Sequence, residues 1–465
     1  MKTQSTAPSH LRPVAKALVK ALPEGTVLFD DDVTSRSAGI WRTDTLKARI
    51  LVKPRTTEEV STTLRICNEL GQSVVTQGGL TGLVESAITQ PDDVILSLAL
   101  MNQIEAVQPL ERTMIVQSGC TLQSIQEAAE AQGLMFPLDL GSRGSCTIGG
   151  NIATNAGGNR VIRYGMARDM VLGLEAVLAD GTVVSSMNLM IKNNAGYDLK
   201  HYFIGSEGTL GVITRAVLRC REQVTSSPTF MAGIDTFDQL SRFLKHVDRA
   251  FSGNLSAFEV MWNDYYKLVT TPPSLNQAPL PENYNYYVLV EAMGASEEQN
   301  QQALEQALEE DLIADAVIAQ SETQRLQLWG LRDDVAQVFQ VAPVFLFDVS
   351  LRISCMQDYV EKVNKTLQSS FPDSKNFTLG HMGDGNLHFA ISVGRDDTQA
   401  RKLVEAAVYE PLKDIAGSVS AEHGVGLEKK PYLHLVRSQS EIRLMKQVKH
   451  SLDPNGILNP GKIFD

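Results

Sequence analysis

The chain has 465 residues, of which 43% are hydrophobic and 21% are charged, and its formal net charge is −12. This balance is that of a globular protein of two or three domains and argues against extended disorder. The acidic charge, with no long basic run, argues against nucleic acid as a partner, because neutralising phosphates requires clustered Lys and Arg.

The five cysteines are widely separated and contain no CxxC pair, so we expect neither a disulfide framework nor a thiolate metal site. This favours a reducing compartment, and we predict the cytoplasm, or the mitochondrial matrix in a eukaryote. The sequence predicts no transmembrane segment, since a span needs about 18 apolar residues in a row. Residues 1–30 lack the apolar core of a secretion signal and favour a soluble first helix, with a short amphipathic presequence as the alternative.

The first half of the chain predicts alternating strands and helices that end in glycine-rich turns. Strands are expected at 50–52 and 73–75, on either side of a helix that starts with Thr56 and Glu59 at the spacing of a capping box. The second strand runs into the glycine-rich stretch 78–83, and open α/β sheets bind ligands at such strand ends. Further strands are expected at 94–98, 114–117, 173–178, 182–185 and 287–291, and a helix at 122–132.

Three glycine-rich stretches, 78–83, 141–165 and 205–211, are candidates for binding a cofactor. Consecutive unhindered backbone N–H groups can form an anion nest for a pyrophosphate. A single stretch of this kind is more often a turn, but three together favour a ligand site. Two other motifs do not fit a nucleotide site: 383–385 lacks the third glycine of a dinucleotide fingerprint, and the GxxxxGK run 456–462 is followed by Ile instead of Ser or Thr.

Three of the eight histidines, His381, His388 and His423, lie in the C-terminal part of the chain. His381 and His388 flank a turn sequence, and a hairpin would place them across from each other on adjacent strands. In an extended segment Glu422 and His423 point in opposite directions, so one can face a metal and the other a substrate. Two histidines and a carboxylate leave open positions on a divalent ion, as a catalytic metal site requires. The alternative is that the histidines are ordinary polar residues of a hairpin.

Arg332 is a candidate for binding a substrate carboxylate, because a guanidinium offers it a bidentate fork. The alternative is a solvated arginine on a helix. From about residue 221 the glycines become rare and charged helical patterns alternate with strands, so we expect a domain boundary there.

These stretches together resemble the FAD-binding oxidoreductases of the vanillyl-alcohol oxidase superfamily, in the branch of D-2-hydroxyglutarate, D-lactate and glycolate dehydrogenases. The resemblance extends from about residue 51 to residue 464. It implies an α+β fold, with a two-subdomain FAD-binding domain of vanillyl-alcohol oxidase type, a mixed α/β substrate (cap) domain and a C-terminal helical segment. The matching runs are 137–141, 148–151, 155–158, 196–199, 203–211, 380–388, 420–426 and 459–462. The implied parts are an N-terminal segment at 1–45, the FAD-binding domain at 46–220, the substrate domain with the metal-site hairpin at 221–415 and a segment returning to the flavin at 416–465.

The resemblance also implies roles for individual residues. His381, His388 and Glu422 match the family's metal ligands, usually for zinc. His423 matches its general base, and Arg332 matches its anchor for the substrate carboxylate. The first glycine stretch lacks the usual histidine for covalent attachment, so non-covalent FAD is implied. The implied FAD-binding residues are Gly78, Gly79, Leu80, Thr81, Gly82, Leu83, Pro137, Gly141, Ser142, Gly149, Asn151, Asn155, Gly158, Gly208, Ile213 and Asn459.

The implied activity is oxidation of a D-2-hydroxy acid to the 2-oxo acid, assisted by the metal, with hydride transfer to flavin N5. An electron-transfer flavoprotein or a quinone is the implied electron acceptor, and a homodimer is left open. The alternatives are a non-redox flavin-dependent synthase of the same fold, or a non-catalytic flavin- or metal-binding protein.

The chain departs from the family pattern in two places. Ala336, Leu346 and Ala390 stand where hydroxyglutarate-specific members commonly have Thr, Lys and Asn, which favours an apolar or shorter substrate tail. Glu85 and Ser86 stand where the first loop often has two more glycines. A carboxylate there would repel a pyrophosphate unless it points away.

Overall fold

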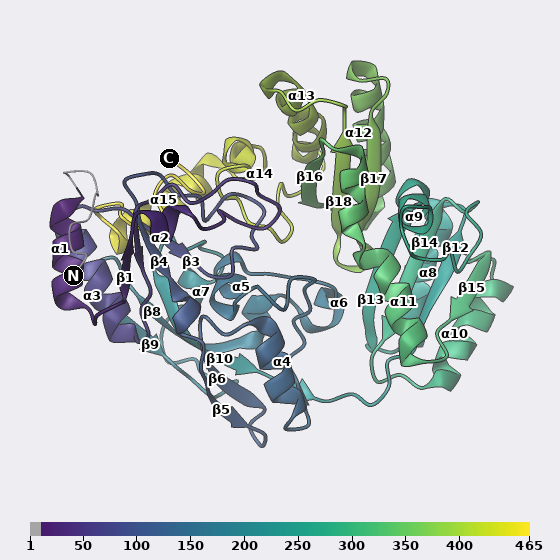
Figure 1. Cartoon of the computed structure of the whole chain (residues 1–465). Helices are drawn as coiled ribbons and strands as arrows, with labels where there is room; N and C mark the ends of the chain where they lie inside the picture. The colour runs from purple at the N-terminus through teal and green to yellow at the C-terminus, as the bar shows by residue number, and fades with distance from the viewer. Residues whose placement is uncertain (1–10) are drawn as a thin grey trace. The chain divides into compact units, whose positions relative to one another are not determined.

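The computed structural model describes residues 11–465, which divide into two units (Figure 1). The first unit contains the chain to Gly158, Met166–Gln223 and Glu422–Asp465, and the second contains Asn159–Gly165 and Val224–Ala421. Each unit combines helices with antiparallel or mixed sheet, which confirms the α+β class. Residues 1–10 of the predicted N-terminal segment lie outside the described residues.

The first unit contains a four-stranded sheet whose order is β1-β2-β4-β3, with bounds Val27–Phe29, Ile50–Val52, Val94–Ser97 and Val74–Gln77. The strands β2, β4 and β3 are parallel, and β1 is antiparallel to β2. Helices α1 (Arg12–Ala21) and α3 (Thr57–Glu69) pack together against one apolar face. Helix α3 begins at the predicted cap, where the Thr56 side chain accepts from the Glu59 amide at 3.2 Å.

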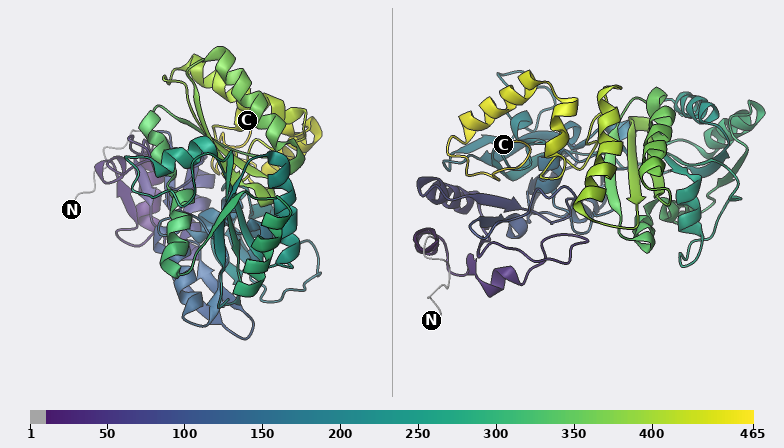
Figure 2. Two further views of the ribbon diagram at one scale, coloured as in Figure 1. Left: turned by 90° about the vertical axis from the view of Figure 1, so that its right-hand side faces the viewer. Right: turned by 90° about the horizontal axis from the view of Figure 1, so that it is seen from above.

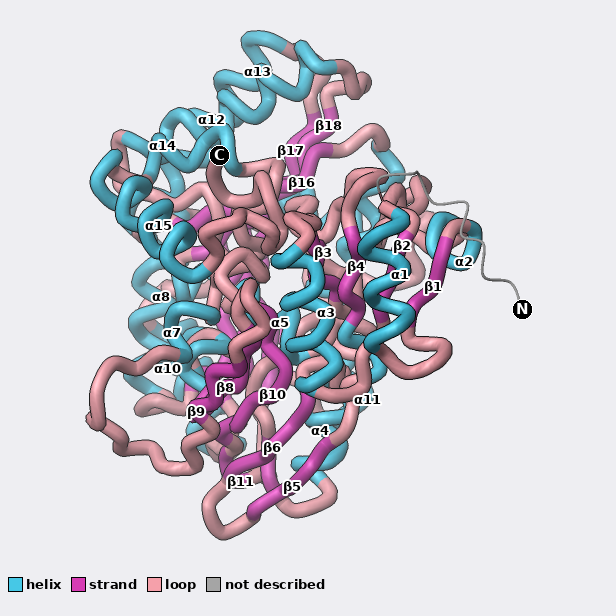
Figure 3. Tube along the Cα trace, turned by 90° about the vertical axis from the view of Figure 1, so that its left-hand side faces the viewer, coloured by secondary structure: helices cyan, strands magenta, loops and turns pink. Residues whose placement is uncertain are grey.

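A five-stranded antiparallel sheet forms the rest of the first unit, in the order β5-β6-β10-β8-β9 (Figure 3). The C-terminal segment joins the four-stranded sheet at its β3 edge, because the Val74 amide donates to Ile457 O and Val74 O accepts from the Asn459 amide, each at 2.8 Å. The five-stranded sheet has the bounds Ile104–Gln108, Thr113–Gln117, Val212–Arg219, Val171–Val177 and Val183–Ser186, in sheet order. A separate two-stranded sheet pairs β7 (Leu134–Met135) with β11 (Arg221–Glu222). The helices of the unit also include α2 (Asp31–Thr34), α4 (Leu122–Glu130), α5 (Ile148–Thr154), α7 (Lys200–Phe203), α14 (Leu433–Val436) and α15 (Gln439–Leu452).

The second unit is built on one seven-stranded antiparallel sheet, in the order β15-β12-β14-β13-β17-β18-β16. Figure 2 shows helices on both faces of this sheet. Neighbouring residues on a strand face opposite sides, so Met231 contributes to the core under α9 (Asn263–Thr270) and α11 (Glu322–Asp333), while Phe230 contacts Phe243 of α8 (Phe237–Ala250) on the other face. The strands are Asp315–Ile318, Thr229–Ile234, Tyr286–Ala292, Leu255–Trp262, Lys375–His381, Asn386–Ser392 and Phe345–Ser350 in sheet order. The helices are α8 (Phe237–Ala250), α9 (Asn263–Thr270), α10 (Glu297–Glu309), α11 (Glu322–Asp333), α12 (Met356–Ser370) and α13 (Thr398–Tyr409).

The short helix α6 (Val161–Tyr164) groups with the second unit, although the sequence places it within the stretch predicted to bind FAD. Arg163 explains this grouping, because its guanidinium donates to Asn254 Oδ1 at 3.0 Å and also bonds to the Met293 carbonyl. These contacts join positions far apart in the sequence, and no local pattern predicts them.

Candidate metal and flavin sites

The two predicted histidine ligands lie on the hairpin formed by β17 and β18. His388 stands opposite Leu379 in the strand register, so His381 is its diagonal neighbour and not its direct partner, as a simple hairpin would predict. The prediction is wrong in this detail because β17 continues to His381 and β18 begins at Asn386, so the connecting turn lies closer to His381 than to His388 and is not centred between them. The rings still approach edge to face, with centroids 5.2 Å apart.

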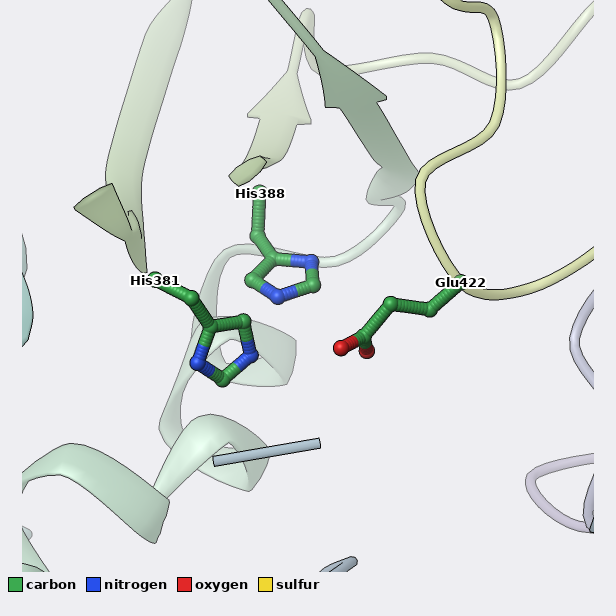
Figure 4. Close-up of side chains that lie close together, drawn as sticks. All are labelled: His381, His388 and Glu422. Atoms are coloured by element: carbon green, nitrogen blue, oxygen red, sulfur yellow. The ribbon is translucent and has the colours of Figure 1, made fainter. Parts of the chain in front are cut away.

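The hairpin histidines and Glu422 form the one three-residue group with metal-ligand chemistry in the described part of the chain, residues 11–465. One ligand atom from each residue lies within 4.8 Å of the others, and Figure 4 shows the three side chains directed toward one another. Glu422 directly follows Ala421, whose amide donates to Asp348 Oδ2 at 2.9 Å. Two imidazoles and one carboxylate fit a divalent cation such as zinc.

Arg332, predicted as a substrate anchor, lies beside His381 in the second unit. Its Nη2 is 3.0 Å from His381 Nε2, and the residue is only 8% exposed, which contradicts the alternative of a solvated helix arginine. Burial acts to lower the pKa of Arg332, but the carboxylates of Glu259 and Asp333 together outweigh it, so the net shift is upward. The side chain therefore remains a cation in a buried position.

Sequence reasoning missed two buried carboxylates next to the histidines. Glu259 of β13 is the register partner of His381 and accepts from its Nδ1 at 2.8 Å. Asp348 of β16 is the register partner of His388. Burial acts to raise the pKa of Glu259, but His381 and Arg332 together hold it below its ordinary value. The signal that could have identified Glu259 is a single charged residue in a strand sequence, 255–262, that is otherwise mostly apolar.

The first two glycine stretches pack directly against each other in the first unit. A Cβ on Gly78 would lie 2.4 Å from Thr147 Oγ1, and one on Gly79 would lie 2.0 Å from the Ser145 carbonyl oxygen. Only glycine allows this approach of two backbone segments. The loop that follows β3 is thus fixed by its contact with the start of α5.

Several buried polar atoms beside these loops have no hydrogen-bond partner among the described residues. Buried polar groups are normally bonded, so these orphaned atoms beside the glycine loops fit a site for a polar ligand, and the glycines fit the close approach of a flavin nucleotide. Asn151 and Asn459 of the predicted FAD-binding set supply two of these atoms. The atoms are Thr76 Oγ1, Ser118 Oγ, Thr147 Oγ1, Asn151 Oδ1 and Asn459 Oδ1.

Two glutamates near the first loop are held by partners within the first unit. Glu85 pairs with Arg42 at 2.8 Å, so a cation faces its carboxylate. Glu207 accepts from the amides of Val425 and Gly426 at 2.7 and 2.9 Å and also bonds to Ser86. Sequence analysis assigned Glu207 no role, although it fastens the C-terminal segment that carries Glu422.

The remaining residues that were predicted to bind the flavin all lie in the first unit. The Gly158 amide donates to Glu422 Oε1 at 2.7 Å, which places this glycine beside the proposed metal ligand. Asn155 adopts a left-handed backbone conformation, with φ 51°, and accepts from the Arg168 amide. Ile213 is buried in β10.

The three residues that replace the Thr, Lys and Asn of hydroxyglutarate-specific members lie in the second unit. Leu346 and Ala390 are register partners on β16 and β18, and both belong to the apolar core that α9 and α11 cover. Ala390 follows His388 by two positions and therefore shares its face of the sheet. Ala336 lies in the adjoining helical turn Val335–Val341. The surface next to His388 is therefore apolar on this side.

Comparison with known proteins identifies the family. Residues 48–186 match the model described as FAD binding domain, and residues 224–463 match that described as FAD linked oxidases, C-terminal domain. The chain belongs to the FAD-linked oxidase family. The matched FAD-binding domain contains both glycine contacts and four of the five orphaned polar atoms, and Asn459 lies in the second matched region.

Relatives align over nearly the whole chain. A mitochondrial D-2-hydroxyglutarate dehydrogenase of Bos taurus is 38% identical over 454 residues, covering 96% of this chain and 82% of the relative. A D-2-hydroxyglutarate dehydrogenase of Xanthomonas citri is 39% identical over 424 residues, covering 89% and 88%. A mitochondrial protein of Schizosaccharomyces pombe, provisionally named a D-lactate dehydrogenase, is 39% identical over 430 residues, covering 90% and 82%.

Solved structures share the fold at low identity. The structure of p-cresol methylhydroxylase superposes with a TM-score of 0.78 at 16% identity, covering 98% of this chain and 97% of the other. That of alkyldihydroxyacetonephosphate synthase gives a TM-score of 0.76 at 17% identity, covering 99% and 86%. These likenesses confirm the vanillyl-alcohol oxidase type of fold and carry no argument about chemistry. Within residues 11–465, no helix has the length and apolar character that crossing a bilayer requires.

Proposed function

We propose that this FAD-linked oxidase is a dehydrogenase that converts a D-2-hydroxy acid to the 2-oxo acid with the help of a divalent metal, zinc in the first place. The observation that carries the proposal is the convergence of His381, His388 and Glu422 to within 4.8 Å. Relatives named as dehydrogenases of D-2-hydroxyglutarate and D-lactate support the substrate class.

When bound, FAD supplies the hydride acceptor and the metal supplies Lewis-acid polarisation. The residues of the chain do the rest. Arg332 binds the substrate carboxylate through its guanidinium fork, and Glu259 fixes the Nε side of that guanidinium at 2.8 Å. His423 takes the hydroxyl proton, a task that suits an imidazole near neutral pH.

We infer that the substrate has a short or apolar tail, such as D-lactate or an aliphatic D-2-hydroxy acid. Leu346 and Ala390 lie side by side on the face of the sheet that carries His388, and neither offers a charge to a second carboxylate. Burying a carboxylate without a partner is costly. A dicarboxylic substrate such as D-2-hydroxyglutarate is therefore disfavoured, although two of the relatives described above are named for it.

The finer features of the cofactor and partners are part of the same proposal. FAD is bound without a covalent link, and the predicted glycine and asparagine residues hold it. The electron acceptor is an electron-transfer flavoprotein or a quinone. The protein works in the cytoplasm, or in the mitochondrial matrix of a eukaryote.

The proposal is tested by mixing the FAD-loaded protein, without oxygen, with D- and L-lactate, longer aliphatic 2-hydroxy acids and D-2-hydroxyglutarate. We expect the D-monocarboxylates to bleach the oxidised flavin fastest. Faster bleaching by D-2-hydroxyglutarate would overturn the inference about the tail. If none of the 2-hydroxy acids bleaches the flavin, the proposed activity is overturned, and a non-redox or non-catalytic flavoprotein is favoured.

A further inference from the structure

We infer that Glu259 is a positioning residue that orients the proposed metal ligand His381 and the proposed substrate anchor Arg332 at the same time. The inference rests on the metal-assisted function proposed above. It adds a residue that touches neither the metal nor the substrate and acts through the two that do.

The two carboxylate oxygens of Glu259 are divided between the two partners. Oε1 is 2.8 Å from His381 Nδ1, and Oε2 is 2.8 Å from Arg332 Nε. A carboxylate accepts hydrogen bonds, so the proton of a neutral His381 ring lies on Nδ1 and Nε2 presents a lone pair. A metal-binding histidine commonly has this arrangement, in which the second ring nitrogen donates to a carboxylate and fixes the tautomer.

The backbone sets the distance between the carboxylate and the ring. Glu259 and His381 are register partners on β13 and β17, so the ladder of the sheet holds their Cα atoms opposite each other. Glu259 has no exposed surface, and His381 is 4% exposed. Water therefore cannot substitute for the carboxylate, and leaving either partner unsatisfied in this position is costly.

Arg332 links the two tasks. Its Nη2 donates to His381 Nε2 at 3.0 Å, so a metal bound to that nitrogen would take the lone pair that accepts this hydrogen bond and would leave Nη2 beside the metal, free to bind a substrate. A substrate carboxylate held by Arg332 would consequently lie close to His381 Nε2. One buried carboxylate thus aligns both proposed binding groups, and its loss is expected to weaken metal and substrate binding together.

Glu291 provides a matched control in the same sheet. It lies on β14, which pairs with β13, and it is also completely buried. Its carboxylate pairs with Arg325 at 2.8 Å and accepts from Trp329 Nε1 at 3.2 Å. Replacing it removes an equally buried charge without touching His381 or Arg332.

The test measures zinc affinity directly. FAD-loaded protein is freed of metal with a chelator, and zinc is titrated in competition with a chromophoric chelator for the wild type, Glu259→Gln, Glu291→Gln and His388→Ala. FAD content and thermal unfolding are recorded for each variant. We expect Glu259→Gln to bind zinc about 10–100-fold more weakly than the wild type at equal FAD content, and Glu291→Gln to bind it as the wild type does.

The outcomes separate the inference from the proposed function. If the wild type fails to bind zinc, or if His388→Ala binds it equally well, the proposed metal site is wrong. If His388→Ala loses zinc while Glu259→Gln matches Glu291→Gln, only the inference about Glu259 is overturned. Should Glu259→Gln fail to fold, Glu259→Asp serves in its place, since it keeps the charge but is one methylene too short to reach both partners. Wild-type zinc affinity in Glu259→Asp would likewise overturn the inference.

Discussion

Replacing Gly79 by alanine is expected to separate the two glycine stretches on which the FAD-binding surface depends. The added Cβ would lie 2.0 Å from the Ser145 carbonyl oxygen and 3.0 Å from Cys146 Cα, and both are backbone atoms. Ordinary contact begins at 3.4 Å, so the carbonyl would have to retreat by about 1.4 Å. Overpacking of this kind costs about 1–3 kcal/mol.

The assay compares thermal unfolding and FAD content of Gly79→Ala with those of Gly82→Ala, a change in the same loop with no atom within 4 Å of the new Cβ. Each kcal/mol lowers the Tm of a domain by about 2–4 °C, so Gly79→Ala should lower it by roughly 2–12 °C. The comparison is made on FAD-free protein, and FAD retention is then measured separately. Because Gly82 belongs to the predicted FAD-binding set, the Tm of the FAD-free protein decides the comparison, and an equal Tm in the two variants would refute the argument that the loops need this contact.

Three further predictions follow from the second unit and from the cysteines. Arg332→Lys should raise KM for the 2-hydroxy acid at least about tenfold in steady-state assays, because an ammonium cannot reproduce the bidentate fork; an unchanged KM would exclude Arg332 as the anchor. Gly330→Ala should stabilise the protein by about 0.5–1 kcal/mol and so raise its Tm, because alanine favours a helix more than glycine does and the nearest atom to the new Cβ on α11 is 3.8 Å away. A lower Tm would contradict this. At pH 8, Cys355, which is partly exposed, should react with a thiol reagent before Cys67 and Cys220, whose pKa values burial raises to about 12 each; equal labelling rates in the native protein would contradict the burial.

Local sequence signals predicted the elements that carry the first glycine stretch. The strand at 50–52, the helix cap at Thr56 and the strand leading into 78–83 were predicted from short apolar runs and from capping, which act over a few residues. The structure confirms each of them. The glycines of that stretch were predicted as ligand contacts, and the structure adds that Gly78 and Gly79 are also required by the packing of the chain on itself.

Contacts between distant parts of the chain could not be predicted from spacing. Glu259 is 122 positions from His381, and only the sheet register brings them together. The same holds for Arg163 and Asn254, which are 91 positions apart. The grouping of Glu422 with the hairpin histidines was first predicted from the types of the residues, with ordinary polar hairpin histidines as the alternative, and the resemblance to a known family then favoured the metal site. The position of Glu422 depends on the path of the chain after Ala421, which no local sequence pattern predicts.

The claim that a metal held by His381, His388 and Glu422 supports substrate oxidation is tested most directly by removing the metal while FAD remains bound. The rate at which a D-2-hydroxy acid reduces the flavin is measured without oxygen, before chelation, after chelation and after zinc is restored. We predict that the rate falls at least about a hundredfold on chelation, as expected when a polarising cation is lost, and returns with zinc. Flavin reduction at an unchanged rate in metal-free protein would contradict the account.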